Sequence, residues 1–225
     1  MNSGEKNPGF FFRQVMRDIW FTFLTHLSVQ FLMLSTVLCF VAVSLLDVWS
    51  YWPFALLVVV IAPFYEWVTH KYTLHLPLKQ EAGFIRRYQI RLHHGHHAEP
   101  ERRDLQFAPA SAIFLMFVQF YLSYALVAWL FGVNGWEAAF VPCLASLVYY
   151  LAYEWIHLAH HTSSYKPFTS WGRNMREAHM RHHFHNENFN WGITNGLGDK
   201  VLGTWKDIDD VPRSPNAKSI AGYQN

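Results

Sequence analysis

Cysteine is nearly absent from this chain of 225 residues, which contains only Cys39 and Cys143. Both lie within apolar runs, where a free cysteine behaves as a small buried hydrophobe, so no disulfide framework is expected. Charged residues are also scarce, at 15% of the chain, and the net charge is only +2. This balance gives no reason to expect a nucleic-acid partner.

A cleavable signal peptide is also not expected. Lys6, Arg13 and Arg17 are followed by an apolar run that is too long for the core of a signal peptide, and no small-residue cleavage site follows that run. The mature chain is therefore expected to equal this sequence.

Long apolar runs are what the sequence has in abundance, since 52% of its residues are hydrophobic. A helix needs about 20 apolar residues to cross a hydrocarbon core of about 30 Å. Four runs suit this length: residues 21–46, 52–68, 110–131 and 138–156. They predict an all-α, multi-pass membrane protein with one integral-membrane domain over residues 21–210.

The 18 lysines and arginines lie only in the N-terminal segment and in two later segments, residues 71–103 and 166–218. None lies in the short connectors at residues 47–51 and 132–137. Cytoplasmic loops carry an excess of basic residues, so both termini and the middle loop are predicted to be cytoplasmic. The four runs would then form two membrane hairpins, in a bacterial inner membrane or the endoplasmic reticulum.

The two ends of the chain are expected to lie outside the membrane domain. Residues 1–20 form a cytoplasmic segment in which residues 9–20 suit a helix lying in the membrane interface. The alternative is that this stretch simply continues the first spanning helix. Residues 211–225, rich in Pro, Ser and Asn, are expected to be a mobile tail.

Histidine is the most informative residue type, because 13 of the 14 histidines lie in four short clusters. Side chains three and four residues apart share one face of a helix, so these clusters present several imidazoles together. A storage tract would instead be contiguous. The spacing indicates metal binding by two cytoplasmic regions, residues 70–109 and 157–210, which together form a helical cap beneath the membrane helices.

The chain also repeats itself. The sequence Tyr-Glu-Trp-Val at residues 65–68 recurs as Tyr-Glu-Trp-Ile at residues 153–156, and four histidines recur 86 residues later. A repeat of this kind would bring two equivalent sets of ligands together beneath the bilayer.

Ten histidines fit the needs of two metal ions, since four ligands satisfy one structural zinc. The predicted ligands are His70, His75, His93, His96, His97, His157, His161, His179, His182 and His183. Imidazole suits iron, copper, zinc and nickel alike. A redox centre at the inner ends of lipid-facing helices would meet both an apolar substrate and a soluble electron donor, which favours oxidation of a C–H bond.

The other histidines carry weaker predictions. His160 shares a face with His157 and is an alternative to His161, although the repeat favours His161. His94 and His185 are expected to be neighbours that form hydrogen bonds or face solvent. His26 is expected to be a buried polar contact within the first run.

Two glutamates lie close to predicted ligands. Glu66 is four residues before His70, and Glu154 is three before His157. A metal-bound histidine commonly donates its outer N–H to a carboxylate. Both glutamates are therefore predicted to accept these N–H groups, the alternative being that they reach water at the interface.

The order and spacing of the four clusters resemble those of the fatty acid hydroxylase superfamily, also called the sterol desaturase superfamily. Residues 93–109 and 182–204 resemble its fatty acid 2-hydroxylase branch in particular. The resemblance implies a dinuclear, all-histidine centre of two iron ions, in which zinc can replace iron on purification. It further implies O2, two electrons from an external donor and hydroxylation of a lipid acyl chain. No cytochrome b5 domain precedes the membrane runs, so a separate ferredoxin-like or cytochrome b5-like protein is expected to supply the electrons.

The substrate and its entrance have several candidates. Phe184, Phe189 and Trp191 follow the last cluster and are candidates for lining the substrate entrance, the alternative being simple packing. Sterol or carotenoid hydroxylases and desaturases share the same histidine plan and remain alternatives. A divalent-metal transporter is a weaker one, because transporters bind their substrates near the bilayer midplane.

Overall fold

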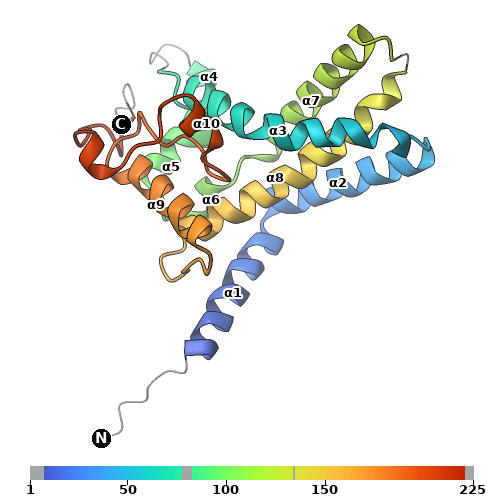
Figure 1. The fold of residues 1–225 in the computed structure, drawn as a ribbon. Helices are drawn as coiled ribbons and strands as arrows, with labels where there is room; N and C mark the ends of the chain where they lie inside the picture. The colour runs from blue at the N-terminus through green and yellow to red at the C-terminus, as the bar shows by residue number, and fades with distance from the viewer. Residues whose placement is uncertain (1–7, 78–82, 134, 221–225) are drawn as a thin grey trace, which may run out of the picture.

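The computed structural model describes residues 8–77, 83–133 and 135–220. These residues form helices joined by turns and loops, and none of them is in a strand. The molecule consists of a bundle of long helices and a smaller group of short helices at one end of it, with α1 projecting away from both (Figure 1).

Four helical stretches among the described residues are long and apolar enough to cross a membrane, as the sequence predicts. Their cores are α2, α3, α7 and α8, which span Leu27–Leu45, Trp52–Val68, Ala110–Leu130 and Phe140–His161. Many of their large apolar side chains face outward, among them Val59, Val60 and Leu130 at more than 60% exposure. Such outward apolar faces are those of a membrane protein.

Helix α8 is the centre of the bundle, and both α2 and α3 have their most extensive interface with it. The core between α2, α7 and α8 contains Leu32, Ile113 and Leu147. Both cysteines are buried in the same core and are free, in agreement with the sequence. A packed α8 matters for function because its last two turns carry histidines.

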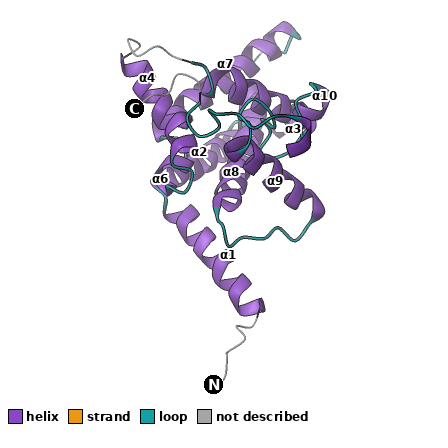
Figure 2. Ribbon diagram, turned by 90° about the vertical axis from the view of Figure 1, so that its left-hand side faces the viewer, coloured by secondary structure: helices purple, strands orange, loops and turns teal. Residues whose placement is uncertain are grey.

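The first membrane run is interrupted. Helix α1 spans Pro8–Thr25, and α2 begins only after His26, so the expected single run over residues 21–46 is wrong. His26 has an extended backbone, and its Nδ1 accepts a hydrogen bond from Ser28 N at 3.3 Å, which makes it the N-cap of α2. The chain therefore changes direction here, and α1 is a separate helix rather than a continuation (Figure 2).

The short helices form a cap over the end of the bundle. They comprise α4 (Gly83–Gln89), α5 (Gly95–Ala98), α6 (Arg103–Gln106), α9 (Ser170–Phe184), α10 (Leu197–Val201) and a 3-10 turn, η6 (Ile208–Asp210). The described part of the expected mobile tail also belongs to the cap, because Ala217 and Ile220 are buried. The mobility expected of the tail stays a prediction, and residues 221–225 lie outside the described residues.

Candidate metal centre

All ten predicted ligands come together where the bundle meets the cap, and they separate into two groups. Within each group, one ligand nitrogen per histidine lies within 4.8 Å of all the others. Group one consists of His70, His75, His93, His97 and His182; group two consists of His96, His157, His161, His179 and His183. Every member is buried except His161, which is partly buried.

Each group takes four histidines from one half of the repeat and one from the other half. His96 belongs by sequence to the first half but lies in group two, and His182, its equivalent 86 residues later, lies in group one. This reciprocal exchange explains why both halves are needed for either group.

Two π-helical segments adjust the first half to this arrangement. Thr69–Leu74 is a π-helix (η2) continuing α3, and its last backbone bond joins His75 N to His70 O at 3.1 Å. A π-turn brings residues five apart onto one face, which an α-helix does not do. In the second half His157 and His161 are four apart on a regular α-helix. The second π-helix, Ile90–His94 (η4), carries His93 into group one.

The separations between ring nitrogens are those of ligands to a shared ion. His93 Nε2 lies 2.9 Å from His70 Nε2 and 2.9 Å from His75 Nε2. A neutral imidazole nitrogen has either one N–H or one lone pair, so it cannot make two good hydrogen bonds at once. Imidazoles bind zinc at about 2.0–2.1 Å, which places two ligands at right angles about 3 Å apart. Ion binding therefore accounts for the spacing better than hydrogen bonding.

His183 gives a second indication of metal binding. Its side chain is fully buried, and neither ring nitrogen has a hydrogen-bond partner among the described residues. A buried polar group without a partner is costly. A metal ion bound to one nitrogen would remove much of that cost, so the residues present fit the ion that their spacing predicts.

The protonation state of these histidines also suits an ion. Burial, reinforced by neighbouring imidazoles, holds the pKa of His93, His97 and His183 well below the usual range. The rings are therefore neutral at pH 7, and a neutral imidazole is the form that binds metal.

Comparison with known proteins shows the family to which the chain belongs. The sequence profile of the Fatty acid hydroxylase family matches residues 55–204, which is about two thirds of the chain and includes both groups. The chain belongs to the fatty acid hydroxylase family.

Two individual proteins are also similar to this chain. It is 28% identical over 156 residues to dihydroceramide fatty acyl 2-hydroxylase FAH1 of Arabidopsis thaliana, covering 68% of this chain and 60% of that protein. The fold resembles the structure titled full-length scs7p, in which only the hydroxylase domain is visible, with a TM-score of 0.55 and 20% identity. That match covers 92% of this chain and 67% of the other, and it supports the fold alone.

Four of the ten histidines donate their outer N–H groups to backbone carbonyls rather than to carboxylates. His70 Nδ1 donates to Trp191 O at 2.6 Å, and His157 Nδ1 donates to Gln106 O at 2.9 Å. His182 and His97 donate in the same way to Phe189 O and Ala217 O. These bonds fix the tautomer that leaves Nε2 free for an ion.

The predicted direct contacts of Glu66 and Glu154 with histidines are therefore not formed. Glu66 instead accepts hydrogen bonds from the backbone of Ile193 and Thr194, and Glu154 accepts one from Ala108 N at 3.3 Å. Both glutamates are buried, so the alternative that they reach water is wrong as well. Spacing along a helix predicts that Glu66 and His70 lie close together. It does not predict that a loop packs between them and binds both side chains.

The four remaining histidines lie outside both groups. His160 is buried, with its ring centroid 5.5 Å from that of His179, so the repeat selects correctly between His160 and His161 for group membership. His94 is also buried. His185 donates to Val211 O at 2.9 Å. His26 caps α2, stacks on Phe107 and is only half-buried.

The aromatic residues after the last cluster have different positions. Trp191 is buried, and its ring lies 4.7 Å from His75 and 5.2 Å from His182, measured between centroids, so it forms a wall of group one. Phe184 is exposed and lies beside Lys218, whereas Phe189 is partly buried. The structure thus separates the three rather than lining one entrance with them.

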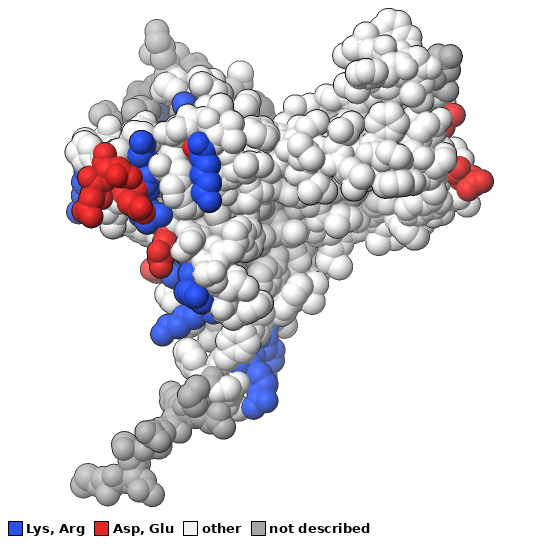
Figure 3. All heavy atoms as spheres, in the orientation of Figure 1, with Lys and Arg blue, Asp and Glu red and all other residues white. Residues whose placement is uncertain are grey.

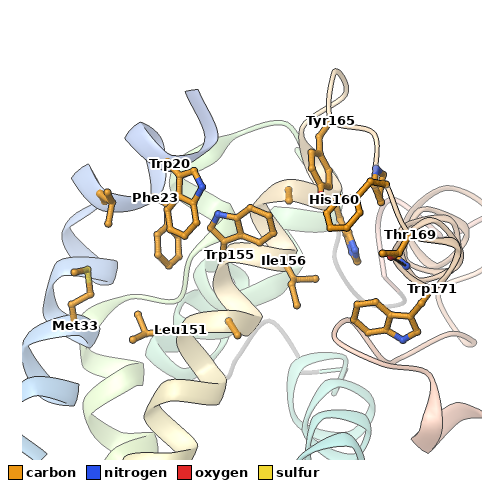
Figure 4. A pocket seen from close by; sticks show the side chains of 16 residues that line it. Trp20, Phe23, Met33, Leu151, Trp155, Ile156, His160, Tyr165, Thr169 and Trp171 are labelled. Carbon is orange, nitrogen blue, oxygen red and sulfur yellow. Dashed lines mark hydrogen bonds between the residues drawn. The ribbon is translucent and has the colours of Figure 1, made fainter. Parts of the chain in front are cut away.

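An apolar groove that the sequence does not predict lies along α8, close to group two. It has a volume of about 640 Å³ and runs between α1, α8 and the start of α9. Trp20 and Trp171 stand on opposite sides of it, with Leu151 and Ile156 of α8 between them (Figure 4). His160 lines the groove, and its ring centroid lies 5.5 Å from that of His179, a member of group two.

Proposed function

We propose that this protein hydroxylates a lipid acyl chain with O2 at a centre of two iron ions, one held by each histidine group. The observation that carries the proposal is the convergence of ten histidines into two groups of five. The balanced reaction converts R–H, O2, two electrons and two protons into R–OH and water. Two iron ions bound there would supply the activation of O2 and the oxidation of the C–H bond.

The residues of the chain contribute position and the exclusion of water. Nine of the ten candidate ligands are buried, which keeps solvent from the place where a reactive oxidant would form. The backbone carbonyls that receive the outer N–H groups hold the imidazoles in one orientation. Zinc would fill the same sites without supporting redox chemistry.

A fatty acyl chain destined for 2-hydroxylation is the substrate that the comparisons favour. The curated relative is named a dihydroceramide fatty acyl 2-hydroxylase, and this chain spans about 60% of its length. We propose a separate ferredoxin-like or cytochrome b5-like protein as the electron donor. The cap is its docking side, because the metal groups lie there.

We also propose that the cap and both termini are cytoplasmic. Lysines and arginines gather over the cap and α1 in Figure 3, and none is seen at the opposite end of the bundle on that face. That end carries the short connections between spanning helices. The positive-inside rule then orients the chain, with its connections across the membrane from the cap.

Lipid analysis tests the function. We expect membrane lipids from cells that express this protein to contain an acyl species heavier by one oxygen, and cells without it to lack that species. The label should come from 18O2 and not from labelled water. An added oxygen on sterols or carotenoids would support the alternative substrate classes, and unchanged lipids with altered metal content would support a transporter.

The groove beside group two is our proposed site for the acyl chain. Filling it with Ala152→Trp should raise the KM for lipid by about 10-fold or more, because losing contact with even two methylenes costs about 1.6 kcal/mol. Val148→Trp is the control, since Val148 is exposed one turn earlier on α8 and does not line the groove. Metal content should stay unchanged in both variants.

Phe184→Trp tests the alternative entrance predicted from the sequence. A rise in KM in this variant, with none in Ala152→Trp, would place the entrance at Phe184 instead of the groove.

A further inference from the structure

A short loop beside group one, residues 191–194, is held by two buried carboxylates that touch none of the histidines through hydrogen bonds. The first is Asp199, at the start of α10. Its Oδ1 accepts from Trp191 N at 2.9 Å, and its Oδ2 accepts from Gly192 N at 2.7 Å. Thr204 Oγ1 adds a bond to Asp199 Oδ1 at 2.6 Å. Both oxygens of this fully buried carboxylate are therefore engaged.

The second carboxylate is Glu66, near the end of α3. Its Oε1 accepts from Ile193 N and from Thr194 N, the latter at 2.9 Å. Its Oε2 accepts from Thr194 Oγ1 at 2.6 Å. Four consecutive backbone N–H groups are thus bound by two carboxylates, one from the membrane bundle and one from the cap.

This loop contacts three histidines of group one, directly or through its neighbour Phe189. The carbonyl of Trp191 accepts the outer N–H of His70, and its indole ring packs against His75 and His182. The preceding residues contribute too, since Phe189 O accepts from His182 Nδ1 at 2.8 Å. Three of the five histidines of group one therefore depend on where the loop lies.

We propose that Glu66 and Asp199 are positioning residues for the group-one metal ion, acting through the 191–194 loop. The proposal rests on the proposed function in one respect, namely that group one binds an ion. The carboxylates hold the loop, and the loop orients His70, His75 and His182.

The physical reason is that this loop is buried and has no regular secondary structure. Its N–H groups have no helix or sheet in which to pair, and each buried N–H without an acceptor costs about 1–3 kcal/mol. Carboxylates give shorter and stronger bonds to N–H groups than neutral acceptors do. Two of them therefore fix a segment that would otherwise favour a hydrated position away from the histidines.

Group two is supported in a similar way, but by fewer hydrogen bonds. Glu154 accepts from Ala108 N, and Gln106 O, two residues earlier, accepts the outer N–H of His157. Glu66 shows the same step, since it binds Ile193 N, two residues after the carbonyl that orients His70. Each glutamate thus acts on its own group, so loss of Glu66 or Asp199 should affect group one selectively.

Zinc binding to the purified full-length chain, measured by competition with a chelator, tests this inference without any use of activity. Each group is first isolated. Because four histidines can still hold zinc, two ligands are removed from one group in each background. The His179→Ala background also carries His161→Ala, which leaves group one, and the His93→Ala background also carries His75→Ala, which leaves group two. Asp199→Asn is then added to each background. Asparagine places an NH2 group against Trp191 N or Gly192 N, where the structure has an acceptor.

We expect Asp199→Asn to weaken zinc binding by about 10- to 100-fold in the His179→Ala background and to leave it unchanged in the His93→Ala background. Equal weakening in both backgrounds would show a general structural role and would overturn the proposal. So would unchanged binding in both. If the parent chain binds two zinc ions and Asp199→Asn has no effect, this inference fails while the metal centre stands.

Glu66 supplies an independent measurement if the Asp199 variant does not fold. Glu66→Gln keeps Oε1 for the two N–H groups and can donate its NH2 to Thr194 Oγ1, so zinc binding by group one should be largely retained. Glu66→Ala leaves these groups without a partner and should weaken binding by group one alone, by at least 10-fold. Equal zinc affinity in the Gln and Ala variants would contradict the proposed role.

Discussion

His183→Ala is expected to abolish lipid hydroxylation and to weaken metal binding by group two. The side chain is fully buried, neither nitrogen has another partner among the described residues, and its ring stacks on that of His97 with centroids 4.0 Å apart. Loss of only the outer partner of a ligand costs about 10- to 100-fold, so loss of the ligand should exceed about 100-fold. Turnover and metal content of the purified variant measure both effects.

Three histidines outside the groups serve as controls for that variant. His94→Ala, His185→Ala and His26→Ala should retain metal and most of the activity, because none of the three belongs to either group. His26→Ala should cost about 1 kcal/mol of stability, since it removes the N-cap of α2. If all four variants lost activity and metal to the same extent, the assignment of histidines to the groups would be wrong.

Acid should destabilise the metal-free protein steeply. Burial holds the pKa well below the usual value of 6.5 for seven histidines outside the spanning helices: His75, His93, His96, His97, His179, His182 and His183. As the pH falls below 6.5 the unfolded chain binds protons that the folded chain does not bind. The free energy of unfolding therefore decreases, by about 1.4 kcal/mol per pH unit for each such histidine.

The size of this effect makes it easy to detect. Three such histidines alone remove about 4 kcal/mol over one pH unit, against a total stability of about 5–15 kcal/mol for typical proteins. We expect the cap of the metal-free protein in detergent to unfold between pH 6.5 and 5, as followed by tryptophan fluorescence and circular dichroism. Stability that stays level from pH 7 to 5 would mean that the histidines are protonated in the folded state.

The set of ligand histidines can be predicted from the sequence, because helical spacing and the repeat both constrain it. His93, His97, His179 and His183 share helix faces, and the offset of 86 residues separates His161 from His160. The division into groups does not follow in the same way. The exchange of His96 and His182 depends on how the two halves approach each other, which no local pattern encodes.

The supports of the histidines could not be predicted for a similar reason. Backbone carbonyls such as those of Trp191, Gln106 and Ala217 are present in every residue, so the sequence carries no sign of their use. Asp199 was missed although it is a charged residue within an otherwise uncharged stretch, residues 188–199, which is a signal that a buried role would explain. The burial of Ala217 could likewise not be predicted, because residues 211–220 are mostly polar.

The break at His26 shows the limit of hydropathy alone. Residues 21–46 are apolar enough to be taken as one run, but α1 ends at Thr25 and its buried face, with Val15, Ile19 and Phe23, packs against the base of α8 and the cap. Averaged hydropathy cannot detect a change of direction within an apolar stretch. The capping histidine was the available signal, because a polar side chain that can accept from an N–H is what a helix start needs.

The central claim is a centre of two metal ions held by ten histidines, and a count of metal per chain tests it most directly. Protein purified in detergent and analysed by mass spectrometry of its metals should contain about two ions per chain, as iron, zinc or a mixture. A variant in which both His179 and His183 are replaced by alanine should contain about one. A clean value of one ion in the parent protein, unchanged when excess metal is added, would contradict the two-ion account.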